Sequence, residues 1–111
     1  MSYFQDRTNI IIEKSKVISY LLNPAHPDGW SKAKILIDHG FHPENWEDFT
    51  DSVKNHAQIA KIVSEIETSF GLKIVLSGLL ETPVNKKLLI VSVWIVLKKV
   101  PILVTLYPSR K

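Results

Sequence analysis

The C-terminal third of the chain carries two β-prone segments, and they constrain the fold more than any other feature. Residues 88–97 (LLIVSVWIVL) and 101–108 (PILVTLYP) are rich in Val and Ile, which strands favour. Residues 98–100 supply a turn between them, and Pro101 suits the first position of a strand. The sequence therefore predicts an antiparallel hairpin at this end.

The second of these segments alternates clearly. Two faces are predicted, with Ile102, Val104 and Leu106 on one and Leu103, Thr105 and Tyr107 on the other. Thr105 and Tyr107 thus place two hydroxyls on one face. A strand face that packs in a core has no need of two neighbouring hydroxyls. Two interpretations stay open: site residues on an open sheet face, or ordinary solvent-facing residues that favour strands.

Length and composition indicate one globular domain spanning 1–111. The 111 residues, 45% of them hydrophobic, are enough for one core. The absence of cysteine excludes a disulfide framework and a thiol nucleophile, and it agrees with a cytoplasmic location. Neither a signal peptide nor an apolar run long enough to cross a membrane is evident, so no membrane partner is expected. The net charge of +3 permits a polyanionic partner.

Three helices are predicted in the first half, over residues 8–22, 30–39 and 43–56, because apolar residues recur there at helical spacing. The loop between the first two, NPAHPDG, holds His26 between two prolines. Lys32 falls in the first turn of the second helix, where the helix dipole favours anions. His26, Lys32 and this helix N-terminus are therefore predicted to form an electropositive spot.

The second half is predicted to be a sheet. Residues 72–80 alternate as a strand, and residues 81–86 form a turn before the C-terminal hairpin. Residues 58–70 are ambiguous, because their apolar spacing fits a helix slightly better than a strand. Helices followed by strands predict an α+β fold, with a helical half (about 8–57) packed on one face of an antiparallel β-meander (about 60–108).

The sheet face away from the helices is expected to form a cleft. It would carry hydroxyl, aromatic and lysine side chains: Lys73, Ser77, Ser92, Trp94, Thr105 and Tyr107. Ser92 and Trp94 share a face because they are two residues apart in one strand. We expect Lys73, Ser77, Ser92 and Trp94 to contact a substrate there, with His26 nearby.

Most catalytic motifs are absent from the sequence. There is no glycine-rich phosphate loop and no Gly-x-Ser-x-Gly elbow, and His39 and His42 lack a third metal ligand, so neither a metal nor a cofactor is expected. The remaining residue types suit metal-independent cleavage of RNA by its own 2′-hydroxyl. A histidine moves the proton, a lysine stabilises the phosphorane, and hydroxyls bind phosphate oxygens. The alternative is structural, because a loop histidine and a strand tryptophan often have no catalytic role.

The motifs YLLNPAHPDGWSKAKILIDHGF, Gly71-Leu72-Lys73, VSVW and LVTLYP resemble the pattern of an uncharacterised family of small bacterial proteins and toxin-terminal domains. The resemblance spans nearly the whole chain and implies a strand over about Lys61–Thr68 in the ambiguous region. It implies little about function directly.

A looser resemblance is to the barnase–EndoU–colicin–RelE group of ribonucleases, through helices followed by a four-stranded meander that ends in Thr-x-Tyr-Pro. It implies catalytic roles for His26, Lys32, Thr105 and Tyr107. The chain departs from EndoU-like enzymes in two ways. A second catalytic histidine is not evident, with His39, His42 and His56 as weak candidates, and an expected Lys-Tyr pair reads Lys73-Ile74.

Three functional hypotheses follow. The first is a metal-independent endoribonuclease that leaves a 2′,3′-cyclic phosphate and is the toxin of a bacterial toxin–antitoxin pair, with RNA and a protein antitoxin as partners. The second is a non-catalytic RNA- or protein-binding module of the same fold. The third is a structural or phage-associated protein whose polar sheet face is an interface. The oligomeric state is not indicated by the sequence.

Overall fold

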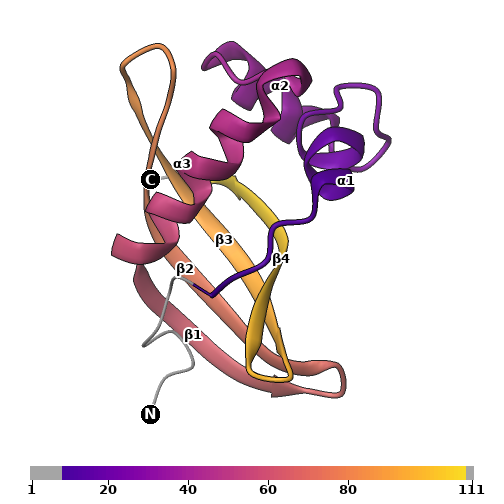
Figure 1. The fold of residues 1–111 in the computed structure, drawn as a ribbon, viewed down its shortest axis with the longest axis vertical. Coiled ribbons are helices and arrows are strands. Elements are labelled where there is room, and N and C mark those ends of the chain that lie inside the picture. The colour runs from indigo at the N-terminus through magenta and orange to yellow at the C-terminus, as the bar shows by residue number, and fades with distance from the viewer. Residues whose placement is uncertain (1–8, 110–111) are drawn as a thin grey trace.

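The computed structural model describes residues 9–109, in which helical segments precede a four-stranded antiparallel sheet (Figure 1). The helical elements are α1 (Lys14–Lys16), the π-helical turn η1 (Val17–Leu21), α2 (Trp30–Asp38), the 3₁₀ turn η2 (Pro43–Asn45) and α3 (Trp46–Ile59). The strands are β1 (Lys61–Thr68), β2 (Gly71–Glu81), β3 (Lys87–Leu97) and β4 (Val100–Pro108). They lie in the order β1-β2-β3-β4, so the predicted α+β fold with a β-meander is confirmed.

The predicted N-terminal helix is too long at its start. Residue 8 lies outside the described residues, and the chain is extended before Lys14. Ile11 instead lies parallel to β4: its N–H donates to the Pro101 carbonyl, and its carbonyl accepts from the Leu103 N–H, both at 2.9 Å. Three consecutive β-branched isoleucines favour this extended path, and they cover an edge that would otherwise be unpaired.

Within the ambiguous region 58–70, residues Lys61–Thr68 form the strand β1, as the family resemblance implies, whereas residues 58 and 59 complete α3. β1 pairs with β2 from Lys61 opposite Ser77 to Thr68 opposite Gly71. The turn depends on Gly71, whose φ is +131° and whose added Cβ would lie 2.8 Å from the Val96 carbonyl oxygen. The pairing with β2 therefore outweighs the slight helical periodicity of this stretch.

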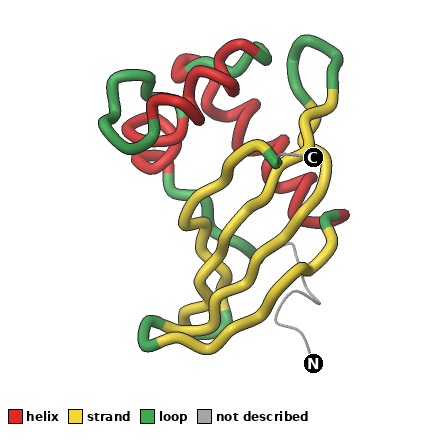
Figure 2. The backbone as a smooth tube through the Cα atoms, turned by 180° about the vertical axis from the view of Figure 1, so that it is seen from behind, coloured by secondary structure: helices red, strands yellow, loops and turns green. Residues whose placement is uncertain are grey.

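The helices cover one face of the sheet, and the strands stand in front of them when the molecule is seen from behind (Figure 2). Between these layers lies one core of fully buried side chains, in which Phe41 and Phe49 pack edge to face at 5.1 Å. The largest of these buried side chains are Trp94, Phe41, Phe49, Leu21, Leu22, Leu36, Ile74, Leu76, Leu80, Ile90 and Leu103. This core fixes the helical half against the sheet, and so positions the loops between them.

A β-bulge changes the predicted alternation of β4. Trp94 lies opposite Leu103 and Val93 lies opposite Thr105, so Val104 is an extra residue in β4. Side chains alternate between the two faces of a strand, and the extra residue shifts this alternation by one. Residues before the bulge therefore lie on the opposite face from the one that simple alternation with residues 105–107 predicts. Leu103 and Leu106 are consequently both buried in the core, whereas Thr105 keeps the opposite face.

Ser92 and Trp94 share a face as predicted, but it is the core face and not the open one. Both are fully buried. Trp94 Nε1 donates a hydrogen bond to Ser92 Oγ at 2.9 Å, and Ser92 Oγ lies 2.8 Å from Nε2 of the buried His56. A hydroxyl can be buried at little cost when its hydrogen bonds are made. The predicted substrate contacts of Ser92 and Trp94 are therefore wrong.

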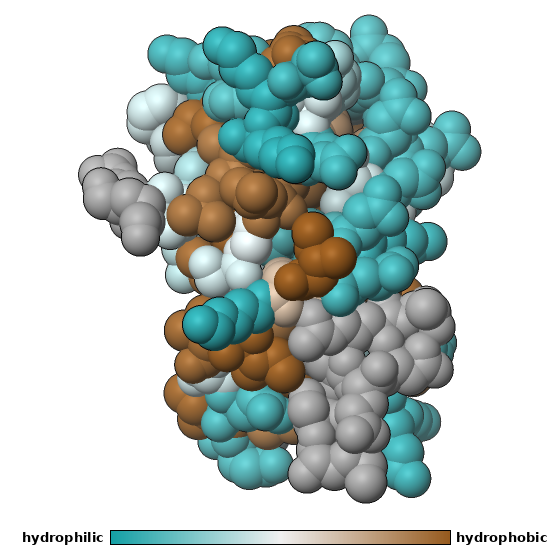
Figure 3. Space-filling view, turned by 90° about the vertical axis from the view of Figure 1, so that its left-hand side faces the viewer, coloured by the Kyte–Doolittle hydropathy of each residue, from teal (hydrophilic) through white to brown (hydrophobic). Residues whose placement is uncertain are grey.

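The outer part of the sheet is more apolar than predicted. Val63 and Ile66 of the edge strand β1 are more than half exposed, and Leu79 of β2 is 42% exposed. On the side of the molecule seen in Figure 3, hydrophobic surface runs through the middle, beside hydrophilic surface above it. Exposed apolar surface of this kind is typical of proteins that bind another protein.

Candidate active site

Three polar side chains from distant parts of the chain meet beside the C-terminal half of β4. Lys32 Nζ donates a hydrogen bond to Tyr20 Oη at 2.7 Å and lies 3.4 Å from Thr105 Oγ1. Tyr20 Oη and Thr105 Oγ1 are themselves 3.1 Å apart. We call these residues the Tyr–Lys–Thr cluster. The sequence predicts Lys32 and Thr105 as site residues, whereas Tyr20 was not predicted.

Local structure places each member of the cluster. Tyr20 lies in η1, where the Leu22 N–H bonds to the Val17 carbonyl five residues back, at 2.8 Å. π-helical turns of this kind often occur at functional sites. Gly29, just before α2, allows the Tyr20 ring to approach, because a Cβ there would lie 2.8 Å from Tyr20 Cε1. The bulge in β4 frees the Val104 carbonyl, to which Lys16 Nζ donates at 3.1 Å.

The cluster favours ionisation of the Tyr20 hydroxyl. Partial burial raises its pKa, but hydrogen bonds from Lys32 and Thr105 and the positive charges of Lys32 and Lys16 outweigh that effect. The pKa of Tyr20 is therefore lower than that of an ordinary tyrosine. A phenol with a lowered pKa beside an ammonium group can exchange a proton with a bound substrate more readily than an isolated tyrosine can.

His26 lies against the cluster but is held in an unexpected way. Its ring packs edge to face on Tyr20, with the ring centroids 4.9 Å apart. Its Nδ1 accepts hydrogen bonds from the backbone N–H groups of Asp28 at 3.0 Å and Gly29 at 3.1 Å, just before α2. Because Nδ1 is an acceptor, the hydrogen of the neutral ring lies on Nε2. His26 is thus positioned to donate a hydrogen bond through Nε2, and its Nδ1 holds the backbone of the loop that leads into α2.

Tyr107 does not join the cluster by any hydrogen bond among the described residues. It lies two residues beyond Thr105 and lines a separate groove of about 330 Å³ with Ser31, Lys32, Ile35 and Pro108. Lys32 therefore belongs both to the cluster and to this groove. Lys32 and Thr105 thus lie in the cluster, whereas Tyr107 shares only the groove with Lys32, and the predicted catalytic roles of these residues stay predictions.

Lys73 and Ser77 lie further away, on β2. Lys73 is opposite Ile95 and Ser77 opposite Val91, on the outer face of the sheet. Two strand spacings separate β2 from β4, which is about 9–10 Å. Their predicted contact with a substrate is possible only for a molecule that extends across β3, and it stays a prediction.

None of the other histidines contacts the Tyr–Lys–Thr cluster within the part of the chain that the structure describes. His39 lies at the end of α2, where its Nδ1 is 2.8 Å from the Ile35 carbonyl oxygen, and His42 is exposed beside η2. His56 is buried in the core, and burial lowers its pKa although backbone groups of Leu79 and Gly78 oppose the effect. Residues 9–109 also hold no cluster of His, Cys, Asp or Glu that could bind a metal ion.

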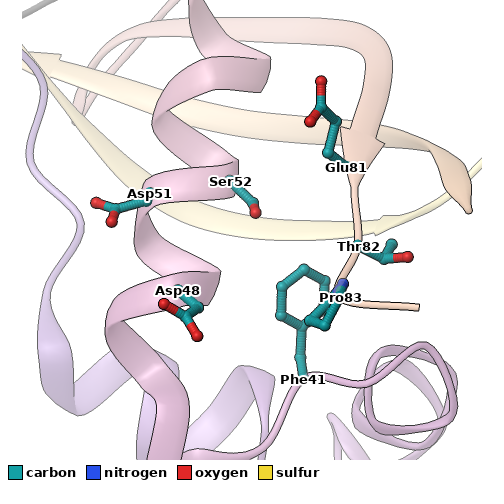
Figure 4. Close-up of a pocket in the computed structure, with 7 residues that line it drawn as sticks. All are labelled: Phe41, Asp48, Asp51, Ser52, Glu81, Thr82 and Pro83. Carbon is teal, nitrogen blue, oxygen red and sulfur yellow. The ribbon is translucent and has the colours of Figure 1, made fainter. Parts of the chain in front are cut away.

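A second groove, of about 270 Å³, lies between α3 and the turn that follows β2 (Figure 4). Asp48, Asp51 and Glu81 line it together with Phe41 and the backbone turn at Pro83. Three carboxylates would repel a phosphate backbone. The charges of the described residues therefore favour the Lys16 and Lys32 side of the molecule for an anionic ligand.

Comparisons with known proteins agree with this fold. The chain belongs to a family described as a domain of unknown function (DUF6883), which matches residues 4–110. No curated protein matches the chain. A chain of the contact-dependent growth inhibition toxin–immunity protein complex from Klebsiella pneumoniae 342 matches it with a TM-score of 0.73 and 14% sequence identity, over 96% of this chain and 99% of that chain.

The predicted membership of an uncharacterised family is thus confirmed. At 14% identity, the match to a chain of the Klebsiella complex shows a shared fold and leaves the chemistry to be argued from the residues. No helix within residues 9–109 combines the length and apolar character needed to cross a membrane.

Proposed function

We propose that this protein is a metal-independent endoribonuclease whose active site is the Tyr–Lys–Thr cluster. The observation that carries the proposal is the convergence of Lys32, Tyr20 and Thr105 within 3.4 Å of one another, from three elements that are distant in sequence. A cation, a phenol of lowered pKa and an alcohol are groups that can bind a phosphodiester and move its protons without a metal.

In the proposed reaction the 2′-oxygen of RNA attacks the adjacent phosphorus, and the bond from phosphorus to the 5′-oxygen breaks. The products are a 2′,3′-cyclic phosphate and a 5′-hydroxyl. The 2′-hydroxyl loses a proton and the leaving 5′-oxygen gains one, so two proton transfers are needed. Lys32 stabilises the additional negative charge on the phosphorane, and the Thr105 hydroxyl donates a hydrogen bond to a phosphate oxygen.

The hydrogen bonds of His26 modify its predicted role. Nδ1 is occupied by the backbone N–H groups before α2, so Nε2 can donate a hydrogen bond to phosphate but can accept a proton only if Nδ1 releases these groups. We therefore assign both proton transfers to the Tyr20–Lys32 pair, whose polar atoms are 2.7 Å apart: the ionised Tyr20 hydroxyl takes the proton of the 2′-hydroxyl, and the Lys32 ammonium group gives a proton to the leaving 5′-oxygen. His26 positions the phosphate in this scheme.

The biological role we propose is that of a toxin inhibited by a protein partner. The fold matches a chain of a toxin–immunity protein complex, which supports a protein partner for this chain as well. Exposed Val63 and Ile66 on the edge strand β1 provide apolar surface for such a partner. The net charge of +3 suits RNA as the other partner.

One observation favours a second candidate function, a non-catalytic binding module. The two backbone hydrogen bonds to His26 are also what a purely structural histidine before a helix would make. A binding module would keep the basic site and bind RNA or protein without cleaving either.

The test uses purified protein and single-stranded RNA in the presence of EDTA. We expect cleavage that leaves 2′,3′-cyclic phosphate ends, and we expect 2′-O-methyl substitution at the cleaved nucleotide to abolish it. Tyr20→Phe keeps the ring that packs on Gly29 but removes the hydroxyl, so cleavage should be lost in a folded protein. RNA binding without cleavage by the wild type would support the binding module instead.

A further inference from the structure

Two turns of the sheet lie side by side at its end opposite α2 (Figure 1, Figure 2). One joins β1 to β2 and carries Phe70, and the other joins β3 to β4 and carries Lys98 and Lys99. A Cβ added to Gly71, next to Phe70, would lie 3.3 Å from Cδ2 of Leu97, so the two turns are neighbours. We call Phe70, Leu97, Lys98 and Lys99 the hairpin tip.

The hairpin tip exposes two large apolar side chains. Phe70 is 79% exposed and Leu97 is 47% exposed. Thr68 holds the turn that carries Phe70, because its Oγ1 accepts a hydrogen bond from the Phe70 N–H at 3.1 Å and donates one to the Gly71 carbonyl oxygen at 2.7 Å. Neither apolar side chain lines a groove described above, so both project outward from the end of the sheet.

This end of the sheet is also positively charged. Residues 66–73 and 93–104 form it, and they contain three lysines but only one carboxylate, that of Glu67. Two of these lysines are the exposed Lys98 and Lys99 of the hairpin tip. The tip should therefore be attracted to an anionic surface.

The backbone at Lys98 and Lys99 indicates that their charges serve a purpose. Both residues have positive φ, 51° and 68°. A two-residue turn of this kind favours Asn and Gly, whereas the side chain of a lysine is strained in it. Residues held in strained conformations often have a binding role, and here that role falls to two ammonium groups.

Apolar side chains that project beside lysines suit an anionic lipid surface better than RNA. At a bilayer, such side chains enter the boundary between headgroups and acyl chains, and lysines bind the anionic headgroups. RNA would gain from stacking of a base on Phe70, but Leu97 has no ring on which a base could stack. A lipid surface is the ligand that uses both apolar side chains and both lysines of the hairpin tip.

We propose that the hairpin tip binds the surface of bilayers that contain anionic phospholipids, with Phe70 and Leu97 inserted among the headgroups and Lys98 and Lys99 bound to the phosphates. This interaction goes beyond the proposed ribonuclease function and does not depend on it. The sequence predicts no membrane partner because it lacks a membrane-spanning segment, but binding at the surface of a bilayer needs no such segment.

The test is co-sedimentation of the purified protein with vesicles of phosphatidylcholine alone, or of phosphatidylcholine mixed with phosphatidylglycerol. We expect binding to the mixed vesicles that weakens as salt is added. Phe70→Ser should lose most of this binding. Lys98→Asn with Lys99→Gly should weaken it about 25-fold, because each lysine near an anionic surface contributes roughly a factor of five. Asn and Gly suit the positive φ of this turn, so this variant should remain folded.

Two control variants remove the same kinds of side chain elsewhere. Trp30→Ser removes an exposed aromatic side chain (55%) from α2, and Lys86→Gln with Lys87→Gln removes two lysines from the hairpin of β2 and β3. Both controls should bind vesicles as the wild type does. Equal loss of binding in the controls, or no binding of the wild type to the mixed vesicles, would overturn the proposal. Loss of RNA binding in Phe70→Ser, with vesicle binding unchanged, would overturn it in favour of an RNA site.

Discussion

Replacing His56 with glutamine should remove a pH dependence from the free energy of unfolding. His56 is 1% exposed, and burial lowers its pKa in the folded protein below the ordinary value of about 6.5. In the unfolded chain His56 therefore takes up a proton at a higher pH than in the folded protein. The unfolded state then binds more protons, so the free energy of unfolding decreases as the pH falls from about 6.5 toward the folded-state pKa.

One proton sets the magnitude of this effect. The contribution of His56 can change by at most about 1.4 kcal/mol for each pH unit in that window, and it is constant above and below it. Protonation would also reverse the 2.8 Å hydrogen bond between Ser92 Oγ and Nε2, because both ring nitrogens of a charged histidine are donors. Glutamine is neutral at every pH, so its variant should lack this slope whatever its stability at neutral pH.

The assay is urea unfolding of the wild type and His56→Gln at several pH values between about 7.5 and about 5. The difference between the two free energies should change with pH, because the remaining histidines and carboxylates contribute equally to both proteins. Ser92→Ala is a second variant, and it removes two buried hydrogen bonds at a cost of about 2–4 kcal/mol. Parallel pH curves for the wild type and His56→Gln would refute the reasoning.

Three further predictions concern the loop before α2 and the β3–β4 turn. His26→Asn should preserve the stability of the wild type, since an amide oxygen can accept the same backbone N–H groups, whereas His26→Ala should lose about 1 kcal/mol in thermal unfolding; equal stability of both variants would show that these two hydrogen bonds do not stabilise the loop. Gly29→Ala should reduce RNA cleavage in a folded protein, because its Cβ would lie 2.8 Å from the Tyr20 ring, and full activity would show that the ring position is unimportant. Lys98→Asn with Lys99→Gly should raise the free energy of unfolding by about 1 kcal/mol or more, because both lysines have positive φ (51° and 68°); urea unfolding with no gain would argue against strain in this turn.

The sequence predicts the β half of the fold well, because its strands carry strong local signals. The hairpin around Lys98 and Lys99 and the strand over residues 72–80 follow from alternation and turn residues alone. The bulge at Val104 could not be predicted in this way, because residues 102–104 are all apolar and their sequence does not reveal that one of them is extra. The same property hides which face of β3 is buried, and this is why Ser92 and Trp94 were placed on the wrong side.

The candidate site was only partly predictable for a related reason. Lys32 and Thr105 could be predicted from the sequence, because a lysine in the first turn of a helix opposes the helix dipole and Thr105 adds a hydroxyl to a strand that is otherwise largely apolar. Tyr20 stands among the apolar residues of a helical pattern, so its spacing predicts a core role. The signal that identifies it is Gly29, whose missing side chain leaves space for the ring, and that relation exists only in three dimensions.

The most direct test of the Tyr–Lys–Thr cluster is a map of RNA ends in cells that express the wild type, Lys32→Met or Lys34→Met. Lys34 is an exposed lysine on the same helix and controls for loss of charge. The wild type and Lys34→Met should arrest growth and produce new 2′,3′-cyclic phosphate ends, and Lys32→Met should produce neither while remaining folded. New ends at wild-type levels with Lys32→Met, or none with the folded wild type, would contradict the assignment of this cluster as a ribonuclease active site.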